Sequence, residues 1–131
     1  MTKEQWEMVE NRLRYPGGLV RLKIDGYNVA LQTQYESKMK LAIAVFIDDK
    51  MKMEHLKPES DTCKRFMCPV KKCAATKKDI EKFSRSKKER QEFKEAYTYT
   101  YYVPYWSSFR RMKSHLIKNN VSIELANKED I

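Results

Sequence analysis

Residues 20–31 place the strongest constraint on what this chain can fold into. Apolar and polar side chains alternate on both sides of Asp25-Gly26, a preferred two-residue loop for a type I′ β-hairpin. That loop gives three opposed apolar pairs, all on one face: Ile24 with Tyr27, Leu22 with Val29, and Val20 with Leu31. Because turn chemistry and register agree, we expect a hairpin with one face turned toward a core.

The segment after the hairpin predicts further strands. Residues 40–47 alternate in the manner of a third strand. The next loop can have two or three residues. We prefer a three-residue loop over 48–50, because Met51 and Met53 then lie opposite Ile47 and Val45; a two-residue loop would place Lys50 and Lys52 opposite them. The pattern therefore predicts a four-stranded antiparallel meander over about 19–54.

Three helices are expected around this sheet. Thr2 and Gln5 have capping-box spacing and begin an amphipathic helix over 3–14. A long basic helix is expected over 77–95, with Ile80, Phe83 and Phe93 as the anchors of a narrow buried stripe, and a C-terminal helix after Ser107 or Ser108. Residues 121–125 are predicted to be a last strand. The fold class is therefore α+β: an antiparallel sheet of four to five strands, an N-terminal meander with these helices packed on it. The length of 131 residues suits a single domain over 1–131.

Charge gives the first indication of function. The chain has 27 Lys and Arg against 18 Asp and Glu, a net charge of +9, and residues 64–90 hold eleven basic and three acidic side chains. Such a surplus favours an anionic partner, although charged runs are often only solvated helix faces. The candidate nucleic-acid or partner-binding residues in and beyond this segment are Lys71, Lys72, Lys77, Lys78, Lys82, Arg85, Lys87 and Lys88, supported by Arg110 and Arg111 on the last helix.

The stretch YTYTYYVPYW, residues 97–106, is unusually aromatic. In a strand, Tyr97, Tyr99 and Tyr101 share one face, while two threonines and Tyr102 share the other. Tyrosines in this arrangement either pack at the rim of a core or stack on bases. We keep both interpretations, with Tyr99 and Tyr101 as candidate binding residues, and expect Tyr105 and Trp106 to anchor the last helix.

Catalytic and metal-binding patterns are weak. Cys63, Cys68 and Cys73 are spaced five residues apart and follow His55, which makes a Cys₃His zinc site chemically conceivable, but the tight spacing of a zinc knuckle is absent. Reduced thiols are the more economical interpretation. The chain has two histidines and no phosphate-binding glycine loop. We therefore predict no enzyme activity, no metal and no cofactor.

The setting is expected to be cytoplasmic. The longest apolar run, 41–47, is much shorter than the roughly 20 residues of a membrane-spanning helix, and the first residues lack the apolar core of a secretory signal. An odd number of cysteines fits a reducing compartment. No membrane partner is predicted.

Three segments carry a resemblance: TKEQWEMVENRL, the DGYNV hairpin and YYVPYWSSFRRMKSHLIKNNVSIEL. They resemble short uncharacterised proteins encoded by tailed phages and prophages. The resemblance covers the two ends of the chain better than the middle and implies life in a bacterial cytoplasm. Small phage proteins there commonly bind nucleic acid, regulate phage genes or block a host defence complex. We expect a non-catalytic protein that binds nucleic acid or a nucleoprotein complex; the alternative is a protein-directed, anti-CRISPR-like inhibitor of host defence.

Overall fold

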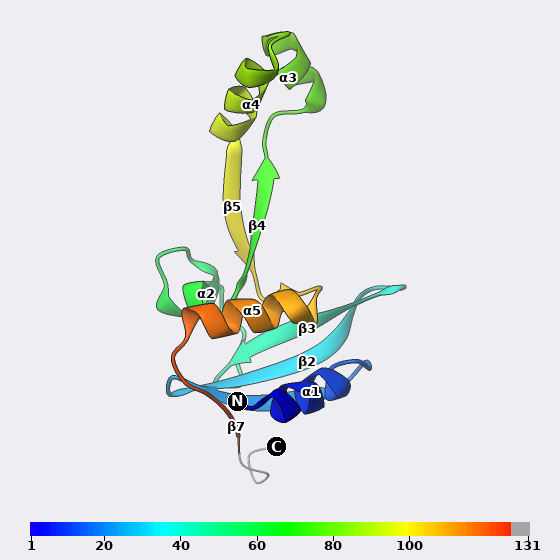
Figure 1. Cartoon of the computed structure of the whole chain (residues 1–131), viewed down its shortest axis with the longest axis vertical. Coiled ribbons are helices and arrows are strands. Elements are labelled where there is room, and N and C mark those ends of the chain that lie inside the picture. The colour runs from blue at the N-terminus through cyan, green and yellow to red at the C-terminus, as the bar shows by residue number, and fades with distance from the viewer. Residues whose placement is uncertain (127–131) are drawn as a thin grey trace. The chain divides into compact units, whose positions relative to one another are not determined.

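The computed structural model describes residues 1–126, which divide into two compact units. Residues 1–68 and 103–126 form the first, here the sheet unit, and Pro69–Tyr102 form the second, here the ribbon unit. Most of the elements are labelled in Figure 1. The helices are α1 (Lys3–Arg12), η1 (Met53–Leu56, a 3₁₀ helix), α2 (Asp61–Phe66), α3 (Lys77–Phe83), α4 (Lys87–Ala96) and α5 (Phe109–Asn119). The strands are β1 (Leu19–Ile24), β2 (Tyr27–Ser37), β3 (Lys40–Ile47), β4 (Cys68–Cys73), β5 (Thr98–Val103), β6 (Tyr105–Trp106) and β7 (Ile123–Leu125).

The sheet unit contains a five-stranded antiparallel sheet in the order β6-β3-β2-β1-β7. The β1–β2 register is the predicted one: Ile24 pairs with Tyr27, Leu22 with Val29, and Val20 with Leu31. Asp25 and Gly26 have φ values of 46° and 89°, the positive values that a type I′ turn needs at both positions. The α+β fold class and the central hairpin are therefore confirmed.

The second turn of the meander differs from the prediction. Ile47 bridges to Lys50, so the loop is a two-residue turn at Asp48 and Asp49, whose φ values are 52° and 62°. Aspartate tolerates this left-handed backbone, and the Asp48 carboxylate accepts a hydrogen bond from the Asn28 amide at 3.3 Å. The three-residue loop was wrong, and so was the fourth meander strand at 51–53, because the chain turns into η1 there.

The core lies on the face of the sheet that carries the three opposed apolar pairs of the β1–β2 hairpin. Trp6 and Val9 of α1 are buried there together with Met112 and Leu116 of α5, and the rings of Trp6 and Phe109 meet edge to face at 6.3 Å. The predicted capping box of α1 is present, with Thr2 Oγ1 accepting from the Gln5 amide at 3.2 Å. Ser108 caps α5. The N-terminal and C-terminal helices therefore form as expected.

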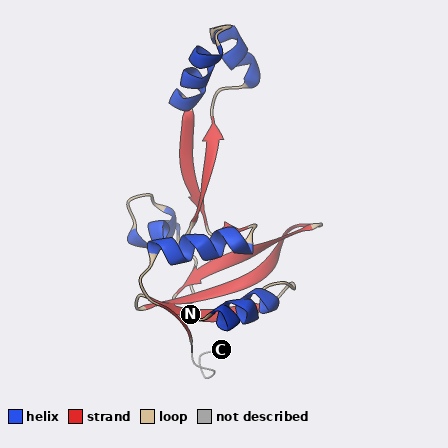
Figure 2. Cartoon of the chain, viewed as in Figure 1, coloured by secondary structure: helices blue, strands red, loops and turns tan. Residues whose placement is uncertain are grey.

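The ribbon unit is a two-stranded ribbon of β4 and β5, and the chain that connects these strands forms the two short helices α3 and α4 (Figure 2). The tyrosine-rich strand is confirmed as β5, and it pairs with β4 instead of joining the five-stranded sheet. The long basic helix over 77–95 was wrong as one element, because Ser84 is fully extended and Ser86 caps a new helix. Ser favours such caps by bonding to nearby amides.

The ribbon unit contains no buried residue, whereas the sheet unit contains the entire buried apolar core of the described chain. The single-domain assignment over 1–131 stays a prediction, since a division by contacts does not test independent folding. Within residues 1–126, no helix has both the length and the apolar character to cross a membrane.

Candidate nucleic-acid interface

The structure gathers most of the predicted binding residues into one unit. Lys71 and Lys72 lie on β4, and Tyr99 and Tyr101 lie on β5. The others of this set are on or between the two helices: Lys77, Lys78 and Lys82 on α3, Arg85 in the break, and Lys87 and Lys88 on α4. Arg110 and Arg111 belong to α5 of the sheet unit, where both are exposed.

The cations of the ribbon unit form no ion pair within residues 1–126. The unit holds ten basic and five acidic side chains, and its eight predicted cations, seven lysines and Arg85, are all exposed. The four ion pairs found within residues 1–126 all lie in the sheet unit. Because an unpaired exposed ammonium keeps its full charge toward solvent, the unit presents a positive potential to an anionic partner.

Both helices of the ribbon unit begin with two lysines, Lys77-Lys78 in α3 and Lys87-Lys88 in α4. The helix macrodipole disfavours cations in the first turn, by roughly 0.3–1 kcal/mol at exposed sites. Helix stability therefore does not account for these four residues. An anion bound beside them would turn the unfavourable placement into a favourable one.

Three of the five carboxylates of the ribbon unit accept hydrogen bonds from neighbouring residues. Asp79 closes the capping box of α3 by accepting from the Thr76 amide at 3.0 Å and from the Thr76 hydroxyl at 2.8 Å. These hydrogen bonds lower the pKa of Asp79 below its ordinary value. Glu89 accepts from the Ser84 hydroxyl, and Glu95 accepts from the Gln91 amide. These three acidic groups thus bond to neighbouring residues, and none of them forms an ion pair with a lysine among the described residues.

Aromatic rings stand beside this charge. Phe83 and Phe93 stack with centroids 4.4 Å apart and planes 21° apart, and Tyr97 follows at 4.7 Å from Phe93. On β5, the rings of Tyr99 and Tyr101 are 6.1 Å apart. Four of the five rings are 40–56% exposed. Tyr97, Tyr99 and Tyr101 are thus not buried in a core, and both packing at a rim and stacking on bases stay predictions.

One of the ribbon lysines shares a strand face with these rings. The Ala74 amide donates to the Tyr97 carbonyl at 2.9 Å, which sets the register of the ribbon. Continuing that antiparallel register along the strands places Lys72 opposite Tyr99 and Val70 opposite Tyr101. Since opposed residues lie on one face of a sheet, a cation and two tyrosines share that face of the ribbon.

Sequence reasoning missed Phe83 and Phe93 as surface residues. It assigned them to the buried stripe of one long helix, but Phe83 is 56% exposed and Phe93 is only partly buried. The fold back at Ser84–Ser86 brings the two rings together. The only signal for this was the Ser-Arg-Ser triplet, which has two cap-forming residues inside an otherwise helical pattern.

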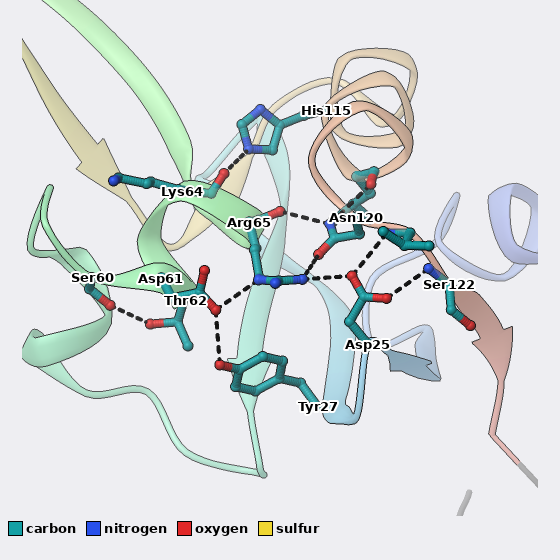
Figure 3. Close-up of polar contacts among 12 residues, drawn as sticks. Asp25, Tyr27, Ser60, Asp61, Thr62, Lys64, Arg65, His115, Asn120 and Ser122 are labelled. Carbon is teal, nitrogen blue, oxygen red and sulfur yellow. Dashed lines mark hydrogen bonds and ion pairs between the residues drawn. The ribbon is translucent and has the colours of Figure 1, made fainter.

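Arg65, which lies in the basic sequence segment, is engaged within the sheet unit (Figure 3). Its guanidinium donates to Asp25 at 2.6 Å, to Asp61 at 2.8 Å and to the Asn120 side chain at 3.2 Å. Tyr27 also donates to Asp61, at 3.1 Å. This cluster ties the β1–β2 turn to α2 and to the end of α5, so Arg65 has a structural role.

Asp25 is the centre of the same cluster. Its carboxylate accepts from the Val121 and Ser122 amides at 2.9 and 2.7 Å, and these bonds, with Arg65, lower its pKa. The hairpin turn therefore also fixes the chain that leads into β7, where the Ser122 carbonyl accepts in return from the Asp25 amide.

The cysteines are placed apart from a metal-binding geometry. Cys63 is buried in α2, while Cys68 and Cys73 are the first and last residues of β4. Burial raises the pKa of the Cys63 and Cys68 thiols. Within the part of the chain that the structure describes, no three His, Cys, Asp or Glu side chains are grouped so as to hold a metal ion.

Comparison with known proteins adds no assignment. No protein-family model matches the chain, and neither curated proteins nor solved structures give a significant match. The resemblance to phage and prophage proteins therefore stays a prediction, and the function rests on the residues of the site.

Proposed function

We propose that the chain is a non-catalytic nucleic-acid-binding protein and that the ribbon unit makes the contact. The observation that carries the proposal is the set of exposed lysines that form no ion pair within residues 1–126, four of which occupy helix first turns. Exposed and partly buried aromatic rings in the same unit, three of which line a groove with Lys82, add a second kind of contact that nucleic acids use. Cations and ring faces together suit a polyanion that carries bases.

Phosphate neutralisation would supply most of the affinity. Each lysine or arginine that meets a phosphate releases condensed counterions, so the logarithm of the binding constant falls with the logarithm of salt by roughly 0.7 to 0.9 per contact. Eight candidate cations lie in the ribbon unit. If six or more touch phosphates, affinity drops about 10³-fold or more between about 50 and 200 mM salt.

Charge reversal tests the proposal. The quadruple variant Lys77→Glu, Lys78→Glu, Lys87→Glu and Lys88→Glu should lose most affinity for labelled oligonucleotides in fluorescence anisotropy. Its salt slope should fall by about one for each phosphate that is no longer neutralised. A matched control reverses four exposed lysines of the sheet unit, Lys3, Lys38, Lys52 and Lys57, and changes the net charge equally. We expect this control to keep most of the affinity.

Two results would contradict the proposal. Binding that does not depend on salt would exclude phosphate neutralisation as its source, and equal losses in both quadruple variants would show that only net charge matters. If no oligonucleotide binds, the remaining candidate is an acidic protein surface, as in an inhibitor of a host defence complex. A pull-down that resists nuclease treatment would then identify that partner.

The proposal includes a cytoplasmic setting in a bacterium that carries a phage or prophage. The resemblance of the three sequence segments supports it, together with an odd number of cysteines, which suits a reducing compartment. Fractionation of a producing bacterium, with detection of the protein in the cytoplasmic fraction, tests this part separately.

A further inference from the structure

We propose that the stacked row of Phe83, Phe93 and Tyr97 is a binding site for unpaired bases, so that the ribbon unit prefers single-stranded to duplex nucleic acid. The inference rests on the proposed function and names the substrate class for it. The row is distinct from the Tyr99–Tyr101 pair on β5, because its rings come from both helices and the residue that ends α4.

The three rings of the row are in close contact. Phe93 lies 4.4 Å from Phe83 with the ring planes 21° apart, and 4.7 Å from Tyr97 with the planes tilted by 46°. The outer rings, Phe83 and Tyr97, are 56% and 50% exposed. A ring that is about half exposed has surface on which an unpaired base can stack, as on the aromatic platforms that bind single strands.

The surroundings of the row suit a nucleotide. The three rings line an open groove of about 500 Å³ together with Ala74 and Ala75, which give it an apolar floor. Lys82 and Asp79 complete the lining. The Asp79 carboxylate accepts from the Thr76 amide and hydroxyl, and Lys82 supplies a positive charge close enough to lower the pKa of Asp79. Lys82 is also the one cation that lines the groove, so it is the group there that can meet a phosphate.

Charge and chemistry together select the occupant. In a duplex the base faces are covered by their neighbours and only the edges are open, so a protein ring can stack only on an unpaired base. A second copy of the chain is disfavoured, because each ribbon unit carries ten basic against five acidic side chains and would repel its like. A single-stranded nucleic acid satisfies both the rings and the cations.

The test compares four probes at one salt concentration with the full chain: oligothymidylate, an abasic oligonucleotide of equal length, a duplex of equal length, and phosphatidylglycerol vesicles. The variant Phe83→Leu with Tyr97→Leu keeps apolar side chains and removes the outer rings. It should weaken oligothymidylate binding by about 5- to 150-fold for each base that loses its stack and leave duplex and abasic binding unchanged. The control Tyr15→Leu with Tyr35→Leu removes two exposed rings of the sheet unit and should change nothing.

A second variant guards against loss of structure. Phe83→Trp keeps a stacking ring and should bind oligothymidylate at least as well as the unchanged chain. Its new indole should be quenched on binding. The native Trp6 and Trp106 also emit, but they are 5% and 2% exposed, so a bound base should leave their emission unchanged. Quenching by the abasic strand to the same degree would contradict stacking.

The outcomes separate the inference from the proposed function. Equal binding of oligothymidylate and the abasic strand, or full binding by the double leucine variant, overturns base stacking and leaves the phosphate-binding function standing. Absence of binding to every oligonucleotide overturns both. Binding to vesicles alone, lost in the double leucine variant, also overturns both and assigns the rings to a lipid surface.

Discussion

Trp106 shows how one side chain organises the sheet unit. It is 2% exposed, its indole nitrogen donates to the Phe66 carbonyl at 3.0 Å, and its ring lies 5.0 Å from that of His115. The β6 residue thereby joins α2 to α5. The prediction that Trp106 anchors the last helix is confirmed, whereas Tyr105 beside it is 39% exposed.

Removal of the Trp106 donor should destabilise the fold. In Trp106→Phe the buried Phe66 carbonyl loses its partner, which costs about 1 to 3 kcal/mol, and the smaller ring adds a packing loss. Urea unfolding monitored by circular dichroism measures the change. Tyr105→Phe is the matched control on the same strand and should lie within about 0.5 kcal/mol of the unchanged chain, because its hydroxyl makes no hydrogen bond within residues 1–126.

His115 should make stability depend on pH. Burial lowers the pKa of His115 below its ordinary 6.5, more strongly than its hydrogen bond to the Lys64 carbonyl raises it. The unfolded chain therefore takes up this proton at a higher pH than the folded chain does. The contribution of neutral His115 to the free energy of unfolding is therefore fully present above about pH 6.5, and it is lost as the pH falls toward the pKa of His115 in the folded chain. The Tm at pH 5.5 should be lower than at pH 7.5, and His115→Gln should reduce the difference; an unchanged difference would assign the effect to other groups.

At the scale of elements, Gly18 controls how the first helix meets the first strand. A Cβ at this position would overlap the Arg12 carbonyl oxygen at the end of α1 and lie 3.0 Å from the carbon of the same group. The Gly18 carbonyl also accepts from the Thr33 amide, and the Thr33 hydroxyl donates to the Leu13 carbonyl at 2.6 Å. The close approach of helix and strand therefore requires the absence of a side chain.

We expect Gly18→Ala to separate α1 from the sheet and to cost about 1 to 3 kcal/mol or more. Gly26→Ala is the comparison, because its Cβ meets nothing within 4 Å and only its φ of 89° opposes the change, at about 1–2 kcal/mol. Thermal unfolding of both variants, with Trp6 fluorescence as the local reporter, distinguishes them. A Gly18→Ala chain as stable as the original would show that the helix end can shift freely.

The elements that sequence predicted correctly are those set by short-range chemistry. Asp25-Gly26 fixes the hairpin, and the Thr2–Gln5 pair and Ser108 fix two helix starts. The elements it missed depend on competition between similar local choices. The Asp48-Asp49 pair suits either loop length by its local chemistry, and the tertiary hydrogen bond from the Asn28 amide to the Asp48 carboxylate accompanies the shorter one. At residues 84–86, the capping serines compete with strong helix formers on both sides.

At the scale of the whole molecule, the buried core and the candidate interface are in separate units. The pairing of β4 with β5 was not foreseen, because 24 residues separate the strands and no turn signal links them. The sequence alone shows the concentration of lysines and their charge. The exposure of Phe83 and Phe93 depends on the break that folds α3 back on α4, and side-chain periodicity did not predict that break.

Replacement of residues 69–102 by an Asn-Gly turn should leave the sheet unit folded, because every buried apolar side chain of the described chain lies outside that segment. The ribbon register places Cys68 opposite Val103, so a two-residue turn can join them. We expect cooperative unfolding with a Tm within a few degrees of the full chain and loss of nucleic-acid binding. An unfolded product would instead support the single-domain assignment.

The absence of buried side chains in the ribbon unit also bears on how the protein can evolve. Substitutions in a packed core are filtered by stability before they are tested for function. In the ribbon unit no residue is buried, so most substitutions there should change the free energy of unfolding little. The positions of charges and rings in this unit can therefore vary almost independently of folding. Evolution can thus change what the ribbon unit recognises while the sheet unit stays constant. In a saturation mutagenesis screen, we expect substitutions in the ribbon unit to be limited mainly by binding and substitutions in the core of the sheet unit mainly by stability.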